Sequence, residues 1–268
     1  KNILRRRPYL YRIKEAHVYG NSNLISTKNN ETSYFGLVFN ANTHKIYAGE
    51  KDNFKSLEDG IEVSYNNILE FDNGIFIGGS DNFGHWLFNC LGRLIYLKLI
   101  DSKIPIVIHD YMPKRFVDCI SYFSNNPIIK IPKNNLCIFN NLYVGTTSWF
   151  ADEKSIIWWN EDIVKFLNKN FVKNINFYNN KLIYLSREST NWRQILNEEN
   201  IFKQLEKIGF QKVKIENLSI KQQINLALQS RVIIAPMGAS TCTYLFASNK
   251  TKCLTLTPNV FSRMFKSE

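Results

Sequence analysis

The pattern of apolar and polar positions changes near residue 70. Before that point, short apolar runs are separated by polar turns, which is typical of strands joined by tight connections. Thr32–Phe39 is such a run, and a turn at Asn40–His44 leads into Lys45–Ala48, so we expect a hairpin there. From Gly74 onward, runs of strand length alternate with stretches in which apolar residues recur every three or four positions. The pattern therefore predicts a β-rich N-terminal extension followed by an α/β fold.

The first stretch of alternation ends near residue 171. The expected strands are Ile75–Ile77, Ile104–Ile108, Ile128–Ile131 and Leu136–Val144, and the expected helices are Phe83–Leu99, Pro113–Phe123 and Ser155–Phe171. The next segment, Val172–Asn180, is rich in asparagine and has no clear period, which favours a linker. We therefore expect an N-terminal lobe, residues 1–172, and a C-terminal lobe, residues 181–268.

The C-terminal lobe has the most regular alternation. The expected strands are Leu182–Leu185, Lys212–Ile215, Val232–Ala235 and Cys253–Leu256, and the expected helices are Asn197–Ile208, Ser219–Leu228 and Ser240–Ala247. Such alternation indicates a parallel sheet with crossover helices, whose binding crevice lies at the carboxyl ends of the strands. The loops 186–193, 216–219 and 236–241 are therefore the expected places for function.

Composition narrows the class of protein. A chain of 268 residues that is 44% hydrophobic is globular, which excludes disordered and coiled-coil proteins. The longest apolar stretch, Trp86–Ile100, is interrupted by Asn89, Arg93 and Lys98, whereas a membrane span needs about 18 largely uncharged residues, so no transmembrane helix is expected. The five cysteines show no CxxC spacing, which favours reduced thiols and a cytoplasmic chain.

The net charge of +11 favours anionic partners: nucleic acid, a phospholipid surface or a phosphorylated substrate. No zinc-finger spacing and no RNP1 pattern occurs, so nucleic acid is the weakest of these options. The only cationic run, Arg5–Arg7, suits peripheral contact with the inner, anionic face of a membrane. No Asp-x-Asp triplet occurs and the four histidines are scattered, so we expect neither a metal nor another cofactor.

The first group of candidate catalytic residues follows the strand that ends at Gly78. His85, Asn89 and Arg93 recur every four residues and so share one face of the expected helix. His85 lies just beyond the carboxyl end of the strand, where an imidazole can take a proton from a substrate hydroxyl, and Asp81 and Asn89 are candidate members of the same catalytic group. The alternative interpretation is a histidine that caps the helix or sits in the core.

The second group follows strands of the C-terminal lobe. Arg187 and Arg193 lie in the loop after the first strand, where two guanidinium groups suit bidentate capture of phosphate oxygens, although surface arginines are the alternative. Glu216, after the next strand, is placed to accept hydrogen bonds from ribose hydroxyls, or is a surface carboxylate.

A turn of small residues supplies the remaining candidates. Gly238 permits a tight turn from the third strand into a helix, and the N–H groups of Gly238, Ala239 and Ser240, with the hydroxyls of Ser240 and Thr241, are predicted to bind an anion at the helix N-terminus. No GxSxG or GxGxxG motif is present, so hydrolase and dehydrogenase functions lose their main support.

These segments, in this order, resemble glycosyltransferase family 61, which includes bacterial capsular-polysaccharide proteins. The matching motifs are N-x-x-H-W-L at Asn82–Leu87, Ser186-Arg187 followed by R-x-x-x-N-E at Arg193–Glu198, and P-x-G-A at Pro236–Ala239. The similarity covers about Gly74–Leu256. Two positions depart from the family pattern: Asn89 replaces a usual acidic residue, and Met237 replaces a usual histidine.

The resemblance implies a GT-B architecture, with two Rossmann-like lobes and the donor nucleotide held by the second. It also implies an inverting sugar transferase that takes a sugar from a nucleotide-sugar donor to a glycan or lipid-linked acceptor in bacterial surface polysaccharide synthesis. His85 is then the base, and Arg93 lies on the acceptor side. The donor is held by Arg187, Arg193, Glu216 and the turn Gly238–Thr241. A catalytically inactive homologue that binds carbohydrate or acts as a scaffold is the alternative, because Asn89 and Met237 depart from the pattern.

Overall fold

The structure is a computed structural model of the chain. It describes residues 9–20, 22–27, 32–34, 54–57, 60–101, 103–147, 149–151, 157–172, 180–188 and 194–257. The chain divides into two compact units, Lys1–Phe166 and Leu167–Glu268. Four predicted features lie wholly or mostly outside the described residues: most of the hairpin expected at 32–48, most of the expected linker, the run Arg5–Arg7, and Arg193. The predicted assignment of acceptor and donor roles to lobes 1–172 and 181–268 stays a prediction.

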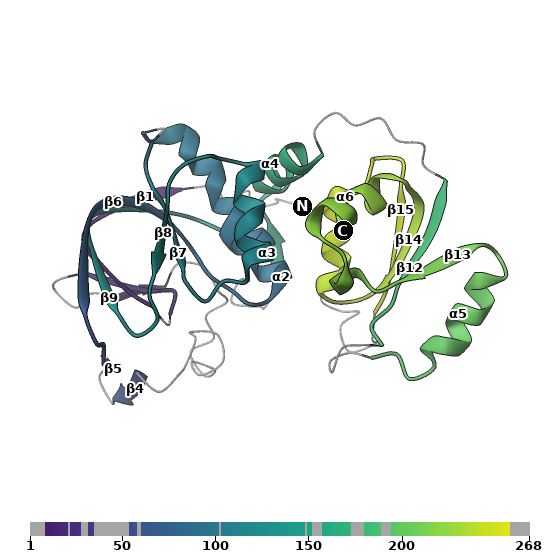
Figure 1. The fold of residues 1–268 in the computed structure, drawn as a ribbon, viewed down its shortest axis with the longest axis horizontal. Helices are drawn as coiled ribbons and strands as arrows, with labels where there is room; N and C mark the ends of the chain where they lie inside the picture. Colours follow the sequence, from purple (N-terminus) through teal and green to yellow (C-terminus); the bar gives the residue numbers. More distant parts are fainter. Residues whose placement is uncertain are drawn as a thin grey trace. The chain divides into compact units, whose positions relative to one another are not determined.

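Unit 1 is built on a mixed sheet of seven strands in the order β3-β2-β1-β9-β6-β7-β8 (Figure 1). The strands are β1 Leu10–Tyr19, β2 Leu24–Thr27, β3 Thr32–Tyr34, β6 Ile68–Gly78, β7 Ile106–His109, β8 Ile128–Ile131 and β9 Leu136–Gly145. The four strands β9, β6, β7 and β8 are parallel, and β1 joins them by pairing antiparallel with β9. Two small antiparallel pairs complete the described strands: β4 Phe54–Leu57 with β5 Gly60–Val63, and β10 Trp149–Ala151 with β11 Ile157–Trp159.

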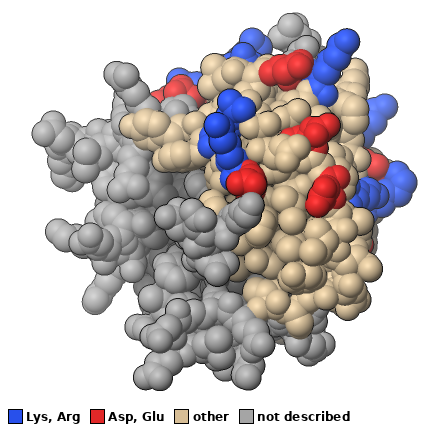
Figure 2. All heavy atoms as spheres, turned by 90° about the vertical axis from the view of Figure 1, so that its left-hand side faces the viewer, with Lys and Arg blue, Asp and Glu red and all other residues tan. Residues whose placement is uncertain are grey.

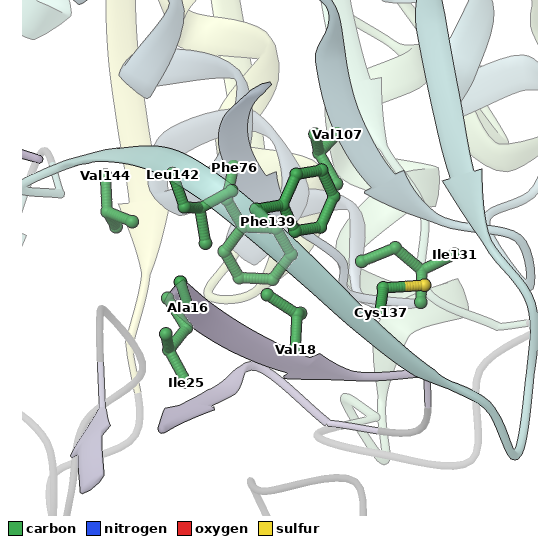
Figure 3. Packing of buried hydrophobic residues seen from close by; sticks show 10 residues of the cluster. All are labelled: Ala16, Val18, Ile25, Phe76, Val107, Ile131, Cys137, Phe139, Leu142 and Val144. Carbon is green, nitrogen blue, oxygen red and sulfur yellow. The ribbon is translucent and has the colours of Figure 1, made fainter. Parts of the chain in front are cut away.

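The core of unit 1 lies against the centre of this sheet. Figure 3 shows its side chains gathered beside β1, β7 and β9. Ala16 and Val18 of β1 alternate toward the core, and the ring of Phe139 stacks on Phe71 with centroids 5.0 Å apart. Burial of this apolar surface is the main stabilising contribution. The packed central strands therefore hold the loops at their carboxyl ends in place.

The helix expected at Phe83–Leu99 is present as one continuous helical run. It begins as α2 Phe83–His85, passes through a π-helical turn, η1 Trp86–Cys90, and continues as the 3-10 helix η2 Leu91–Leu99. The indole Nε1 of Trp86 donates to the carbonyl of Phe116, 3.0 Å away, and so ties the run to α3 Lys114–Val117. The 3-10 helix η3 Asp118–Tyr122 follows α3.

The helix expected at Ser155–Phe171 is wrong in its first part. Ile157–Trp159 is strand β11, and the helix α4 begins only at Glu161 and ends at Phe171. Asn160 marks the boundary, because its side-chain oxygen accepts from the N–H groups of Asp162 and Ile163 at 3.1 and 3.2 Å. The preceding isoleucine and tryptophans have a high intrinsic preference for strands, and this preference outweighs the helical spacing of the apolar residues.

Unit 2 confirms the alternation expected after residue 181. Its four described strands are all parallel, in the order β13-β12-β14-β15. They are β12 Lys181–Leu185, β13 Phe210–Val213, β14 Ser230–Pro236 and β15 Lys252–Leu256. The helical elements are α5 Glu198–Glu206, η4 Ile215–Asn217, α6 Ile220–Leu228 and η5 Ala239–Phe246. Ser219 caps α6 as expected, in a reciprocal capping box with Gln222.

The strand order creates a switch point between β12 and β14. The chain leaves β12 toward β13 through α5 and then returns across β12 to β14 through α6. Figure 1 shows α5 and α6 on opposite sides of this sheet. In open parallel sheets, ligands bind outside the carboxyl ends of the two strands where the order reverses. The loops after β12 and β14 therefore form the favoured binding edge of unit 2.

The described residues contain no helix that is both long and apolar enough to cross a membrane. All five cysteines are free thiols, and only Cys253 is exposed. Burial raises the pKa of Cys90, Cys119 and Cys242 to about 12, so these thiols are protonated at neutral pH.

Candidate functional site

The turn after β6 depends on two glycines. Gly78 has a φ of +85°, and a Cβ there would lie 2.6 Å from the side-chain oxygen of Asn23. A Cβ on Gly79 would lie 2.8 Å from Cδ2 of His109. The first position thus needs the left-handed conformation that glycine adopts readily, and the second needs its lack of a side chain. The turn delivers Asp81 and His85 beyond the carboxyl end of β6.

Asn23 and His109 hold this turn, and the sequence pattern did not reveal either of them. The amide of Asn23 donates to the carbonyl of Gly79 and accepts from its N–H, both at 2.9 Å. The same oxygen lies 3.2 Å from Nε2 of His109, which therefore carries a proton. Burial lowers the pKa of His109 to about 3, so the ring is neutral at physiological pH.

His85 lies in the first turn of the helical run, and its imidazole is neutral near neutral pH. The side chain of Asn82 caps α2 by accepting from the N–H groups of Gly84 and His85 at 2.9 and 3.3 Å. The ring of His85 is partly buried, and its burial lowers the pKa, although the charge of nearby Asp81 acts in the opposite direction. A neutral imidazole close to neutral pH is the form that a general base needs.

Asn89 decides which nitrogen of His85 is the acceptor. Its Nδ2 lies 3.2 Å from Nδ1 of His85, so Nδ1 accepts and the ring proton sits on Nε2. Asn89 is only 2% exposed, and its Oδ1 has no hydrogen-bond partner in the described structure. A half-turn of the amide would bring Oδ1 to a protonated Nδ1 and leave Nε2 as the base. The structure thus brings Asn89, His85 and Asp81 together, as the sequence predicts.

Tyr111 joins this group, which the sequence pattern did not indicate. Its ring stacks on His109 with centroids 5.1 Å apart, and burial raises its pKa, with further contributions from Cys90, Asp81 and Asp110. A neutral phenol near Asp81 can donate a hydrogen bond to a substrate or to a carboxylate. The site in unit 1 therefore offers an imidazole, a carboxylate and a phenol from two strand ends.

Arg93 is buried beneath the turn. It is 2% exposed, and its guanidinium donates to the carbonyls of Gly145 and Ile77 at 3.0 and 2.9 Å. Burial lowers its pKa, and the two carbonyls compensate the loss of water around the cation. These contacts fasten the helix to the ends of β6 and β9. Its expected role on the acceptor side stays a prediction.

In unit 2, Arg187 and Gly238 meet at the carboxyl ends of β12 and β14. Arg187 is 7% exposed, and a Cβ on Gly238 would lie 2.9 Å from its Cζ. Gly238 also has a φ of +152°, which side chains disfavour. Only glycine lets the guanidinium lie against the backbone here. The structure brings these two predicted residues together, and their role toward a donor stays a prediction.

The hydroxyls next to Gly238 stabilise the turn itself. Ser240 donates to the carbonyl of Pro236 at 3.1 Å, and Thr241 donates to that of Gly238 at 2.7 Å. Their protons are therefore used within the turn. The start of η5, at Ala239, can therefore bind an anion chiefly through its backbone N–H groups and the positive end of the helix dipole.

Glu216 lies in η4, directly after β13, and is partly exposed. The buried amide of Gln223 donates to the carbonyls of Ile215 and Leu218, at 3.1 and 3.0 Å, and so holds this turn from α6. Because β13 is the parallel neighbour of β12, Glu216 and Arg187 end adjacent strands of the sheet. Gln223 is a further residue that the sequence pattern did not reveal.

The described residues contain no group of three or more His, Cys, Asp or Glu side chains placed to hold a metal ion.

A family comparison identifies the chain. Residues 83–254, more than half of its length, match the family described as Glycosyltransferase 61. This range includes His85, Arg187 and Gly238. No curated protein matches the chain. The protein therefore belongs to glycosyltransferase family 61 and is a glycosyltransferase.

Proposed function

We propose that the protein transfers a sugar, with inversion, from a nucleotide-sugar donor to a glycan or lipid-linked acceptor in bacterial surface polysaccharide (capsule or lipopolysaccharide) synthesis. The observation that carries the proposal is the contact between Arg187 and Gly238 at the switch point of a parallel sheet. The presence of two α/β units supports a GT-B assignment, in which unit 2 holds the donor and unit 1 the acceptor.

The donor site is suited to a diphosphate. Transfer leaves a nucleoside diphosphate whose negative charge grows as the glycosidic bond breaks, and fixed positive groups stabilise that charge. Arg187 supplies a planar fork that matches phosphate oxygens, and the N–H groups at the start of η5 supply a partial positive charge. Arg193 is expected to add a second guanidinium. Glu216 ends the neighbouring strand, where it can accept hydrogen bonds from ribose hydroxyls.

The acceptor hydroxyl is deprotonated by His85 in this proposal. Burial keeps the imidazole neutral. With the Asn89 amide turned so that its Oδ1 accepts from Nδ1–H of His85, Nε2 is left free to take the proton, and Asp81 stabilises the imidazolium that forms. Inversion follows from a single displacement, in which the activated hydroxyl attacks from the face opposite the leaving diphosphate. No divalent cation is needed in this mechanism, because the positive charge comes from the protein.

An assay of transfer from a panel of nucleotide sugars, with release of nucleoside diphosphate as readout, tests the proposal. Arg187→Ala should lose donor affinity and rate together, since its phosphate contact exists before and during bond breaking. The control is Arg231→Ala, because Arg231 is exposed and lies at the amino end of β14, away from Gly238. Equal activity in the two variants would refute the assigned donor site.

A second candidate function follows from Asn89 and Met237, which depart from the family pattern. An inactive homologue would keep the fold and bind carbohydrate without turnover. Glycan binding together with no donor hydrolysis or transfer, over the whole nucleotide-sugar panel, would favour that function. Turnover of any donor would exclude it.

We further propose a cytoplasmic protein that rests on an anionic membrane surface. On the face of unit 1 shown in Figure 2, described basic and acidic side chains are interspersed, so this face offers no purely basic patch among the described residues. Attraction would then depend mainly on the run Arg5–Arg7, with about 1 kcal/mol for each cation near the surface. Sedimentation with anionic and neutral vesicles at rising salt tests this, and equal binding to both would contradict it.

A further inference from the structure

A buried carboxylate lies next to the proposed phosphate site. Glu198 is the first residue of α5 and is only 4% exposed, whereas Glu199 beside it points outward, with its side chain 61% exposed. Removing a carboxylate from water costs several kcal/mol unless specific contacts compensate it. The buried position of Glu198 therefore calls for a structural or functional reason.

Its contacts lead to Arg187. Oε1 of Glu198 accepts from the backbone N–H of Arg187 at 3.1 Å, across eleven positions of sequence. The carboxylate also lies near Tyr184, whose pKa is raised by burial and by the charge of Glu198, so the phenol stays neutral. The first turn of a helix is where a negative charge is best tolerated. The carboxylate is thus held by the end of β12 and by the start of α5.

The hydrogen bond between Glu198 and the backbone N–H of Arg187 fixes the backbone position that carries the Arg187 side chain. The N–H of Ser186 still belongs to the sheet, because it donates to the carbonyl of Val213 at 2.9 Å. Arg187 is the first residue beyond that ladder, and Glu188 after it pairs with Lys212 of β13. Glu198 therefore secures the backbone position from which the guanidinium reaches Gly238.

We propose that Glu198 is the positioning residue of Arg187, and that it sets affinity for the donor diphosphate without touching it; this rests on the proposed function. A negative charge beside a phosphate site opposes anion binding by itself. Glu198 acts instead through the length of its side chain, which places Oε1 at hydrogen-bond distance from the N–H of Arg187. Glutamine has the same reach without the charge, and aspartate has the charge but is one methylene shorter.

The experiment measures binding of inorganic pyrophosphate to the purified protein by calorimetry. Glu198→Ala and Glu198→Asp should each weaken binding by about tenfold or more, the cost of losing a hydrogen bond to a charged group, while Glu198→Gln should stay within about threefold of the wild type. Glu199→Gln is the matched control and should not change the affinity. If Glu198→Asp bound pyrophosphate like the wild type and Glu198→Gln bound it weakly, the charge would matter rather than the side-chain length, and the proposal would be overturned.

A double-mutant cycle separates positioning from general damage to the fold. In an Arg187→Ala background, the further change Glu198→Asp should have no effect on pyrophosphate affinity, because the arginine through which it acts is gone. Additive losses would overturn the inference. Thermal unfolding of each variant shows that it is folded, and the aspartate and glutamine variants serve if Glu198→Ala does not fold.

The outcomes also separate this inference from the proposed function. If the wild type does not bind pyrophosphate, or if Arg187→Ala binds it equally well, the phosphate site fails and the role of Glu198 fails with it. If the wild type binds through Arg187 while Glu198→Ala and Glu198→Asp bind equally well, only the role of Glu198 fails.

Discussion

The buried histidine beneath the candidate catalytic turn predicts a specific sensitivity to acid. His109 is fully buried, donates from Nε2 to Asn23, and has a pKa of about 3 in the folded protein, against 6.5 in an exposed histidine. Because the folded pKa is the lower one, the unfolded chain binds a proton first as the pH falls. The associated stability is fully present above pH 6.5 and is lost as the pH falls toward 3.

The size of this effect follows from the two pKa values. Each pH unit between them is worth 1.36 kcal/mol, so the interval from 6.5 to about 3 corresponds to about 5 kcal/mol of unfolding free energy. At pH 4.5 about 3 kcal/mol of this is already lost. That is a large share of the roughly 5 to 15 kcal/mol by which a domain is stable.

The assay compares urea unfolding of the wild type and of His109→Gln from pH 7.5 to pH 4.5. Glutamine keeps an N–H that can reach Asn23 and does not titrate, so the difference in unfolding free energy should shift toward the variant by about 3 kcal/mol over this range. His17→Gln, at a partly exposed histidine of β1, controls for the loss of a histidine as such, and the shift of His109→Gln is measured relative to it. A difference that does not change with pH would refute the reasoning, since it would mean that the folded protein accommodates the protonated ring.

Four further predictions concern the reaction. His85→Ala should lower kcat by roughly 10² to 10⁴ with donor binding nearly unchanged, since proton transfer is felt only in the transition state; an unchanged rate in transfer assays would exclude it as the base. Asn89→Asp should raise the pKa of His85, because a carboxylate at this position favours the imidazolium. The acid limb of the kcat/KM profile should therefore move to higher pH, and no movement would contradict the contact. Activity should survive EDTA, whereas activity that is lost in EDTA and restored by Mg²⁺ or Mn²⁺ would point to a metal-dependent mechanism. Arg187→Lys should restore only part of the activity that Arg187→Ala loses, because one ammonium group cannot reproduce the bidentate fork of a guanidinium.

Much of unit 2 could be predicted from the sequence because its signals are local. Strand-length apolar runs alternate with helical spacing. Ser219 marks a helix start through its own cap, and Gly238 lies in the turn after a strand, where only glycine fits. In a parallel sheet, these local assignments also place strand ends at one edge. Arg187 and Gly238 could therefore be placed on the same edge before their contact was known.

The residues that hold the sites in place were decided only by the tertiary structure. Asn23 reaches Gly79 across 56 positions of sequence, His109 reaches Asn23 across 86, and Arg93 reaches Gly145 across 52. Periodicity reports which face of an element is apolar, and carries no information about which distant polar side chain meets a turn. The same limit applies to Glu198: the motif marks its position, but its burial against the N–H of Arg187 depends on how α5 packs on the sheet. Local patterns thus determined the elements and the strand ends, while the partners of the buried polar groups follow from packing alone, because a buried donor or acceptor must pair with whatever the fold brings within reach.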